Sequence, residues 1–250
     1  MHLKINFKSK ELNMPVMLDV LMPQGHGNYK ALYLLHGAGG DHETWILNSR
    51  LPDYVNNKNI AVIMPSANNK FYINNIHGKK YGTFITGELI NQCEKWFNLS
   101  RKSEDRYIAG MSMGGYGAVY SSLTNPGLYN TAFSYSGLLN IMERYDNPHN
   151  IDLFPVFGDR QDLLTNNLDI NQVINNIGNS NVENPTKFII TCGLQDGNLG
   201  MNREFFNKGK ESGLNVKYVE TEGAHNFQYW DECIKQTIKY ICGEDTEWQL

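Results

Sequence analysis

The six residues Gly-Met-Ser-Met-Gly-Gly at positions 110–115 constrain the fold more than any other part of this chain. A short apolar stretch typical of a buried strand, Tyr107–Gly110, precedes the serine, and mostly small residues typical of a helix, Met113–Leu123, follow it. A serine between two such elements lies on a tight strand-to-helix turn, where its hydroxyl group is exposed and its backbone strained. The flanking glycines leave room for neighbouring backbone to pass close to the turn. The pattern predicts a parallel α/β sheet and makes Ser112 a candidate nucleophile.

Apolar runs alternate with helical patterns along the rest of the chain. Continuous or alternating apolar segments predict strands, and amphipathic spacing predicts helices. The expected strands are 3–7, 16–21, 31–35, 60–64, 107–110, 131–136, 187–192 and 215–219, and the expected helices lie within 87–99, 113–123, 204–212 and 227–241. Strands that alternate with helices predict a mostly parallel central sheet with helices on both faces.

The domain organisation follows from the absence of repeats and linkers in the sequence. One α/β domain is expected over residues 1–250. The stretch from Leu138 to Pro185 is rich in Asn and Asp, is the least regular, and is expected to form surface helices and loops. It could hold a small cap over a site but is too short for a separate domain, so a small lid or none is expected.

Composition argues against several other classes of protein. The formal net charge of −4 leaves no basic surplus for binding nucleic acid. No apolar stretch is long enough to span a membrane, and residues 1–13 lack the apolar core of a secretory signal, so a cytoplasmic protein without a membrane partner is expected. The four cysteines form no metal-ligand spacing, which favours free thiols and no metal.

A serine hydroxyl is a weak nucleophile until a base, most often histidine, removes its proton. With a nucleophile on this kind of turn, the acid and the base both follow the serine in the chain. Only His149 and His225 come after Ser112. His149 lies in the Asn-rich stretch and is interpreted as a solvated loop residue. His225 lies between the last expected strand and the closing helix, at the sheet edge where Ser112 is expected, and is the candidate base.

The acid that orients this histidine is expected in a loop after a strand, between the serine and the histidine. Asp196 meets this condition because it follows the strand 187–192. Asp159 is the rival candidate, since it also follows a short apolar stretch, but that stretch contains Pro155 and lies in the irregular region. Asp231 falls on the closing helix and is interpreted as a solvated surface residue. The sequence favours Asp196.

A glycine-rich loop, His-Gly-Ala-Gly-Gly at positions 36–40, follows the third expected strand. A backbone N–H of such a loop can point at the carbonyl oxygen of a bound ester, and the N–H of Met113, directly after the serine, can supply a second donor. The loop lacks the Gly-Lys-Ser/Thr ending of a phosphate-binding loop. It therefore predicts an oxyanion hole, with His36 bracing the loop rather than acting as a base.

Together these motifs resemble those of the Putative esterase branch of the α/β hydrolases, over most of the chain. The resemblance is carried by Leu34–Gly37 with Trp45, Gly87–Ile90, Tyr107–Ala118, Ser134–Gly137, Cys192–Asp196 and Gly223–Phe227 with Trp230. The branch includes tributyrin esterases, S-formylglutathione hydrolases (esterase D), feruloyl esterases and mycobacterial mycolyltransferases. The chain looks most like the small bacterial tributyrin-esterase type, whereas S-formylglutathione hydrolases carry a different sequence at positions 36–38.

The resemblance implies an α/β-hydrolase fold and a serine carboxylesterase that hydrolyses short-chain acyl esters through an acyl-enzyme. It implies Ser112, Asp196 and His225 as the catalytic triad, in agreement with the choice from chain order. It also implies the backbone N–H groups of Ala38 and Met113 as the oxyanion hole, and no cofactor. The expected partner is a small-molecule acyl ester, and the sequence is compatible with a homo-oligomer.

Two other functions remain open at this point. A carbohydrate-directed acetyl or feruloyl esterase could stack a sugar or phenolic ring on Trp45, Phe71, Tyr72 or Trp230, although packing in the core or rim is the favoured interpretation of each. A non-catalytic binding protein on the same fold would usually lack a member of the triad. Because all three triad candidates are present, the sequence predicts an enzyme.

Overall fold

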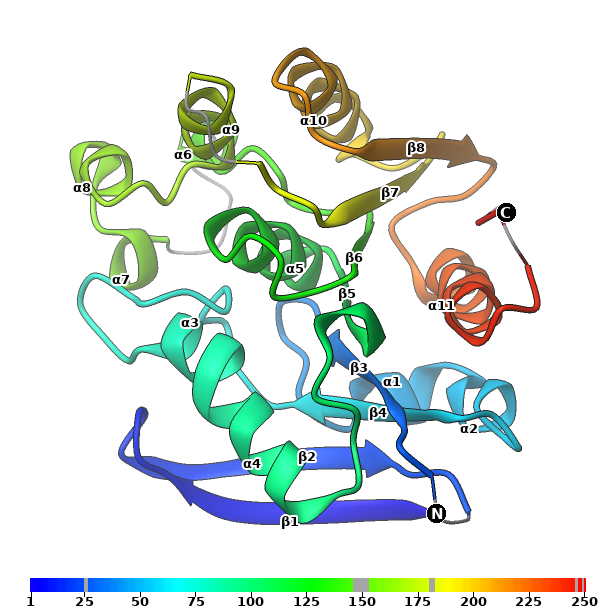
Figure 1. Ribbon diagram of the computed structural model, residues 1–250. Helices are drawn as coiled ribbons and strands as arrows, with labels where there is room; N and C mark the ends of the chain where they lie inside the picture. The colour runs from blue at the N-terminus through cyan, green and yellow to red at the C-terminus, as the bar shows by residue number, and fades with distance from the viewer. Residues whose placement is uncertain (25–26, 146–152, 180–182, 246, 249) are drawn as a thin grey trace.

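The computed structural model describes residues 1–24, 27–145, 153–179, 183–245, 247–248 and 250. Within these residues, eight strands form one sheet in the order β1-β2-β4-β3-β5-β6-β7-β8. The strands are β1 (His2–Ser9), β2 (Met14–Leu21), β3 (Lys30–Leu35), β4 (Ile60–Pro65), β5 (Arg106–Met111), β6 (Thr131–Tyr135), β7 (Lys187–Gly193) and β8 (Val216–Thr221). The β1–β2 and β2–β4 pairs are antiparallel and the other pairs are parallel (Figure 1). The expected mostly parallel sheet is confirmed.

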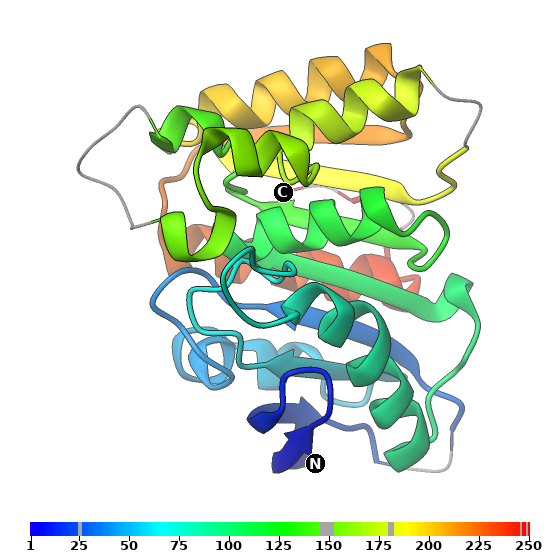
Figure 2. The same cartoon turned by 90° about the vertical axis from the view of Figure 1, so that its left-hand side faces the viewer.

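Helices cover both faces of this sheet. They are α1 (Thr44–Asn48), α2 (Leu51–Tyr54), α3 (Tyr81–Thr83), α4 (Leu89–Trp96), α5 (Met113–Thr124), α6 (Met142–Tyr145), α7 (Phe154–Phe157), α8 (Arg160–Thr165), α9 (Ile170–Gly178), α10 (Leu199–Glu211) and α11 (Phe227–Cys242), with a π turn η1 (Phe84–Glu88) and a 3₁₀ turn η2 (Ser103–Asp105). In Figure 1, α1, α2 and α11 lie on one face of the sheet; in Figure 2, α4, α5, α9 and α10 lie over the other.

The central strands are apolar without interruption because both of their faces are covered. Successive side chains of a strand point to opposite faces. Leu32 and Leu34 therefore pack in the core beneath α1, α2 and α11, whereas Tyr33 and Leu35 pack in the core on the other side. This alternation within one run explains how a fully apolar segment folds as a single buried strand.

Two helices begin earlier than the apolar spacing predicts. The helix expected within 87–99 begins at Tyr81, because α3, the π turn η1 and α4 follow one another without a break to Trp96. Phe84 and Ile85 are fully buried in this first part, so packing holds residues of weak helix propensity in a helix. The helix expected from residue 204 begins at Leu199, somewhat more than one turn earlier.

The irregular stretch after Leu138 contributes to the core as well as to the surface. Helix α9 buries Ile170, Val173 and Ile174 and packs against α5 and α10. The expectation of surface helices and loops was therefore only partly right. Among the described residues, no helix has both the length and the apolar character needed to cross a lipid bilayer.

Candidate active site

Ser112 lies on the predicted turn between β5 and α5, in a strained backbone conformation with φ 54° and ψ −116°. Few non-glycine residues adopt a positive φ, so this conformation is held by the surrounding structure. A Cβ atom at position 114 would lie 2.5 Å from the Leu35 carbonyl oxygen, and one at position 110 would overlap the Gly114 carbonyl. Both glycines of the motif are therefore required by close backbone approach.

The structure brings Ser112, His225 and Asp196 together from three separate loops. The Oγ atom of Ser112 lies 3.1 Å from Nε2 of His225. On the other side of the ring, Nδ1 lies 3.0 Å and 3.1 Å from the two carboxylate oxygens of Asp196. The Asp196 side chain is fully buried, whereas 39% of the His225 side chain is exposed. This geometry allows His225 to remove the serine proton while Asp196 holds its ring.

Several groups hold Asp196 as a charged acceptor. Burial alone would raise its pKa, but hydrogen bonds from His225, the Asn198 backbone amide and Ser136 outweigh burial and lower the pKa below its ordinary value. The Asn198 N–H lies 2.8 Å from Oδ1 of Asp196. Ser136 also accepts a hydrogen bond from the indole N–H of Trp230, whose ring packs edge-on against His225. The carboxylate and the imidazole are thus fixed by a common set of neighbours.

Two backbone amides adjoin the serine hydroxyl. Ala38 and Met113 line the same pocket as Ser112 and His225. Within the described part of the chain, neither amide N–H donates to another group of the protein. Met113 is the first residue of α5, where the backbone N–H groups have no partner inside the helix and favour negative charge. The arrangement can accept a developing oxyanion at this point.

His36 is engaged on both ring nitrogens in the loop before Ala38. Its Nδ1–H donates to the Gly37 carbonyl at 2.7 Å, and its Nε2 accepts from the Ala67 amide at 3.1 Å. Burial lowers its pKa, which favours this neutral form. The Tyr72 hydroxyl donates to the His36 carbonyl at 3.0 Å. His36 thus has the loop-bracing contacts that the sequence predicted.

The rival acid residues have other partners. Asp159 accepts from the Asp162 backbone N–H at 2.8 Å and caps the start of α8. Asp231 was expected to be a solvated surface residue, and this was wrong. It pairs with Arg50 at 2.9 Å and accepts from the Tyr54 hydroxyl at 2.7 Å, which joins α11 to α2. His149 lies outside the described residues.

The pocket in front of Ser112 is small, with a volume of about 140 Å³. Phe71, Leu138 and Leu153 form its apolar wall, and Arg144 donates to the Asn198 side chain at 2.6 Å on its polar side. Sequence reasoning missed Leu138, Arg144, Leu153 and Asn198, because no local motif marks a residue that reaches the site through tertiary folding.

Of the four aromatic residues considered from the sequence, only Phe71 lines this pocket. Trp45, Tyr72 and Trp230 are buried. The Trp45 indole N–H donates to the Leu35 carbonyl, so this ring braces the strand that leads into the oxyanion loop. The favoured interpretation of packing therefore describes these three residues.

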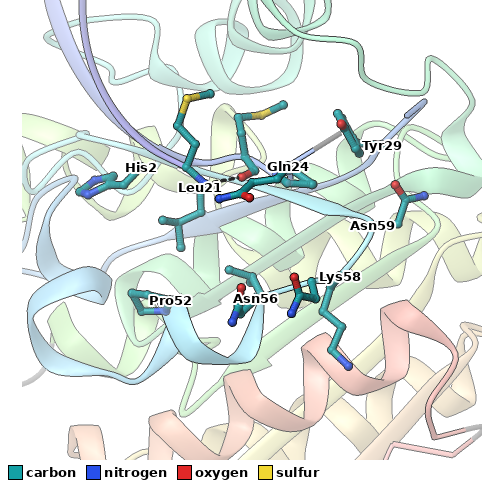
Figure 3. Close-up of a pocket in the computed structure, with 13 residues that line it drawn as sticks. His2, Leu21, Gln24, Tyr29, Pro52, Asn56, Lys58 and Asn59 are labelled. Atoms are coloured by element: carbon teal, nitrogen blue, oxygen red, sulfur yellow. Dashed lines mark hydrogen bonds between the residues drawn. The ribbon is translucent and has the colours of Figure 1, made fainter. Parts of the chain in front are cut away.

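A separate pocket of about 450 Å³ lies near the amino ends of β3 and β4, at the opposite edge of the sheet from Ser112. Its wall includes His2, Leu21, Tyr29 and Lys58 (Figure 3). Lys58 pairs with Glu244 there. Its described lining has no serine beside a histidine, so it is not the candidate active site. In the described ranges, no three His, Cys, Asp or Glu side chains gather as a set of metal ligands.

Comparisons with known proteins identify the family of this chain. The protein family described as Putative esterase matches residues 9–241. An acetyl esterase from Caldicellulosiruptor saccharolyticus is 30% identical to this chain, and the match covers 96% of this chain and 97% of that protein.

Solved structures of serine hydrolases share the fold of this chain. The fluorophosphonate-binding serine hydrolase FphF from Staphylococcus aureus superimposes with a TM-score of 0.89 at 26% identity, over 97% of this chain and 98% of that one. The S-formylglutathione hydrolase FrmB, also from S. aureus, superimposes with a TM-score of 0.82 at 26% identity, over the same shares of the two chains. The chain therefore belongs to the Putative esterase family and is a serine esterase with an α/β-hydrolase fold.

Proposed function

We propose that this enzyme hydrolyses small acyl esters, with acetyl esters preferred, through an acyl-enzyme on Ser112. The observation that carries the proposal is the chain of hydrogen bonds from Ser112 through His225 to Asp196. Ser112 and His225 line a pocket of about 140 Å³. His225 takes the proton of Ser112, whose oxygen attacks the ester carbonyl. The amides of Ala38 and Met113 hold the resulting oxyanion.

The alcohol then leaves with the proton that His225 carries. A water molecule repeats the same steps on the acyl-enzyme, with His225 as base, and releases the acid and the free Ser112. Asp196 keeps Nδ1 of the imidazole protonated and stabilises the imidazolium ion in both halves of the reaction. No step in this scheme uses a cofactor or a metal.

The preference for acetyl groups rests on the size of the pocket. Sites for drug-sized ligands usually measure ~300–1,000 Å³, well above the volume in front of Ser112. Phe71, Leu138 and Leu153 therefore leave room for an acyl group of a few carbon atoms but little for a feruloyl ring. The acetyl esterase relative supports the same acyl group.

We further propose that residues 1–250 act as one catalytic domain in the cytoplasm, on a small-molecule ester. All groups of the proposed mechanism come from one chain, so catalysis is compatible with either a monomer or a homo-oligomer.

A substrate panel tests the proposed function. The values of kcat/KM are measured for p-nitrophenyl acetate, butyrate and octanoate, and hydrolysis is measured for methyl ferulate and acetylated xylan. We expect kcat/KM to fall in the order acetate, butyrate, octanoate, and we expect no cleavage of methyl ferulate. The Ser112→Ala variant should have no activity, and its thermal unfolding should match that of the wild type. A preference for octanoate or methyl ferulate would contradict the acetyl assignment. Activity retained in Ser112→Ala would contradict the mechanism.

A further inference from the structure

A polar groove that the proposed reaction does not use lies along α5. It has a volume of about 780 Å³ and is formed by residues of the loop 72–76, the turn from α3 into η1, the last turns of α5 and the connection between α8 and α9. It shares no lining residue with the pocket in front of Ser112. Because α5 has 12 residues, its far end lies roughly 18 Å from Ser112. The groove is a separate feature of the molecule.

The chemistry of this groove is polar and uncharged. Among the described residues, its lining contains four asparagines, three threonines, two tyrosines and one serine, and no acidic, basic or histidine side chain. Phosphates and carboxylates are normally bound by arginine or lysine, and cations by carboxylates. The groove therefore offers no ion pair to a charged ligand, and its volume falls within the usual range of small-molecule sites.

Asparagine side chains in this lining present oxygen acceptors. The amide nitrogen of Asn125 donates to the Ser121 carbonyl at 2.9 Å, and that of Asn166 donates to the Asp162 carbonyl at 2.7 Å. Since a backbone carbonyl can only accept, these bonds fix which way each amide is turned. Within the described part of the chain, no hydrogen bond reaches the Oδ1 atoms of Asn125 and Asn166. The buried Oδ1 of Asn75, in the same lining, also has no partner there. A ligand that satisfies them must donate hydrogen bonds.

Tyr120 supplies an aromatic surface and a hydroxyl group in the same wall. Its ring stacks on Tyr116 at 5.6 Å between centroids with an interplanar angle of 8°, which fixes its orientation. On the opposite wall, Asn74 accepts from the Thr83 backbone amide at 3.0 Å and also bonds to its hydroxyl. The groove is therefore held in shape before a ligand binds, which lowers the entropic cost of binding.

We propose that this groove binds a neutral saccharide. Sugars carry many O–H donors, which suit the oxygen acceptors of Asn125 and Asn166, and an apolar C–H face, which suits the ring of Tyr120. They carry no charge, in keeping with the uncharged lining. The proposal goes beyond the esterase reaction and does not depend on it, because its residues are distinct from those around Ser112.

Gly87 provides a clean test, because a Cβ atom there would meet nothing within 4 Å and the residue lines the groove. Gly87→Trp places a large side chain over the groove, whereas Gly87→Ala is the matched control that leaves it open. Tyr120→Phe removes the hydroxyl and keeps the stacked ring. Binding of xylotriose, cellotriose and maltotriose is measured by calorimetry, and folding is checked by thermal unfolding.

We expect at least one trisaccharide to bind wild type and Gly87→Ala with a Kd of about 1 mM, which is typical of a few hydrogen bonds on a shallow surface. Gly87→Trp should weaken binding by roughly tenfold or more. Tyr120→Phe should weaken binding several-fold, and it serves as a second readout if the tryptophan variant does not fold. Hydrolysis of p-nitrophenyl acetate should remain at the wild-type rate in all three. Absence of binding to wild type at roughly 20 mM of each sugar, or binding that neither substitution weakens, would overturn the proposal.

Discussion

Replacing Asp196 with asparagine tests how the site holds the base. The Asn198 backbone N–H, 2.8 Å from Oδ1, can only donate, so it will retain the amide oxygen of the new side chain. The amide nitrogen then takes the position of Oδ2, 3.0 Å from Nδ1 of His225. Nδ1 lies 3.1 Å from the retained oxygen and 3.0 Å from this N–H donor. We expect the ring to accept from the nearer donor and to carry its proton on Nε2, which faces Ser112 at 3.1 Å. In that tautomer His225 cannot remove the serine proton.

The size of the effect follows from this tautomer change. In serine hydrolases with the same three groups, the exchange of acid for amide lowers kcat by about 10⁴-fold with the geometry intact. At about 1.36 kcal/mol for each factor of ten, the barrier rises by about 5.4 kcal/mol. We expect the same loss for Asp196→Asn, with KM changed little because the pocket walls are untouched.

The assay is steady-state hydrolysis of p-nitrophenyl acetate, with thermal unfolding of each variant as a check on folding. Asp159→Asn is the control, because Asp159 was the rival acid and asparagine caps a helix as well as aspartate does. It should keep wild-type activity. A loss of less than tenfold in Asp196→Asn, or an equal loss in Asp159→Asn, would refute the reasoning.

Three further predictions follow from the same structure. Leu153→Ala widens the pocket, so the ratio of kcat/KM for butyrate to that for acetate should rise about tenfold; an unchanged ratio would contradict the assigned wall. Gly114→Ala places a Cβ atom 2.5 Å from the Leu35 carbonyl oxygen, so it should lower the free energy of unfolding, measured in urea, by about 3 kcal/mol. Gly200→Ala is the control, because a Cβ atom there meets open space, and it should change the free energy of unfolding by less than about 1 kcal/mol. Hydrogen bonds lower the folded-state pKa of Asp196, so its stabilising contribution is complete above about pH 4 and is lost as pH falls through that lower pKa. The melting temperature of wild type should therefore fall relative to that of Asp196→Asn as the pH is lowered below about 4, and a constant difference would contradict this.

The sheet was predictable because its buried strands are continuous apolar runs that need no tertiary information. The first residues of the helices were harder to predict from the sequence. Gly82 and Gly87 weaken the helical pattern before α4, and Gly200 does the same at the start of α10, so only the packed structure shows that these turns are helical. Packing of Phe84 and Ile85 outweighs the weak propensity there.

The three side chains that meet at the candidate active site could be selected from chain order and strand context, since the serine turn has a strong local pattern. The residues of the pocket wall could not be selected in this way. Leu138 follows β6 and Leu153 precedes α7, and only the tertiary fold brings both to the site. The pairing of Asp231 with Arg50 was missed for the same reason, because the two residues are far apart in sequence and no local pattern joins them.

The central claim is that Ser112 is an activated nucleophile. A fluorophosphonate probe reacts with such a serine, and peptide mass spectrometry locates the adduct. The account predicts a single adduct on Ser112, its loss in Ser112→Ala, and slower labelling in Asp196→Asn. No adduct on the wild-type protein, or an adduct on another residue that persists in Ser112→Ala, would contradict it.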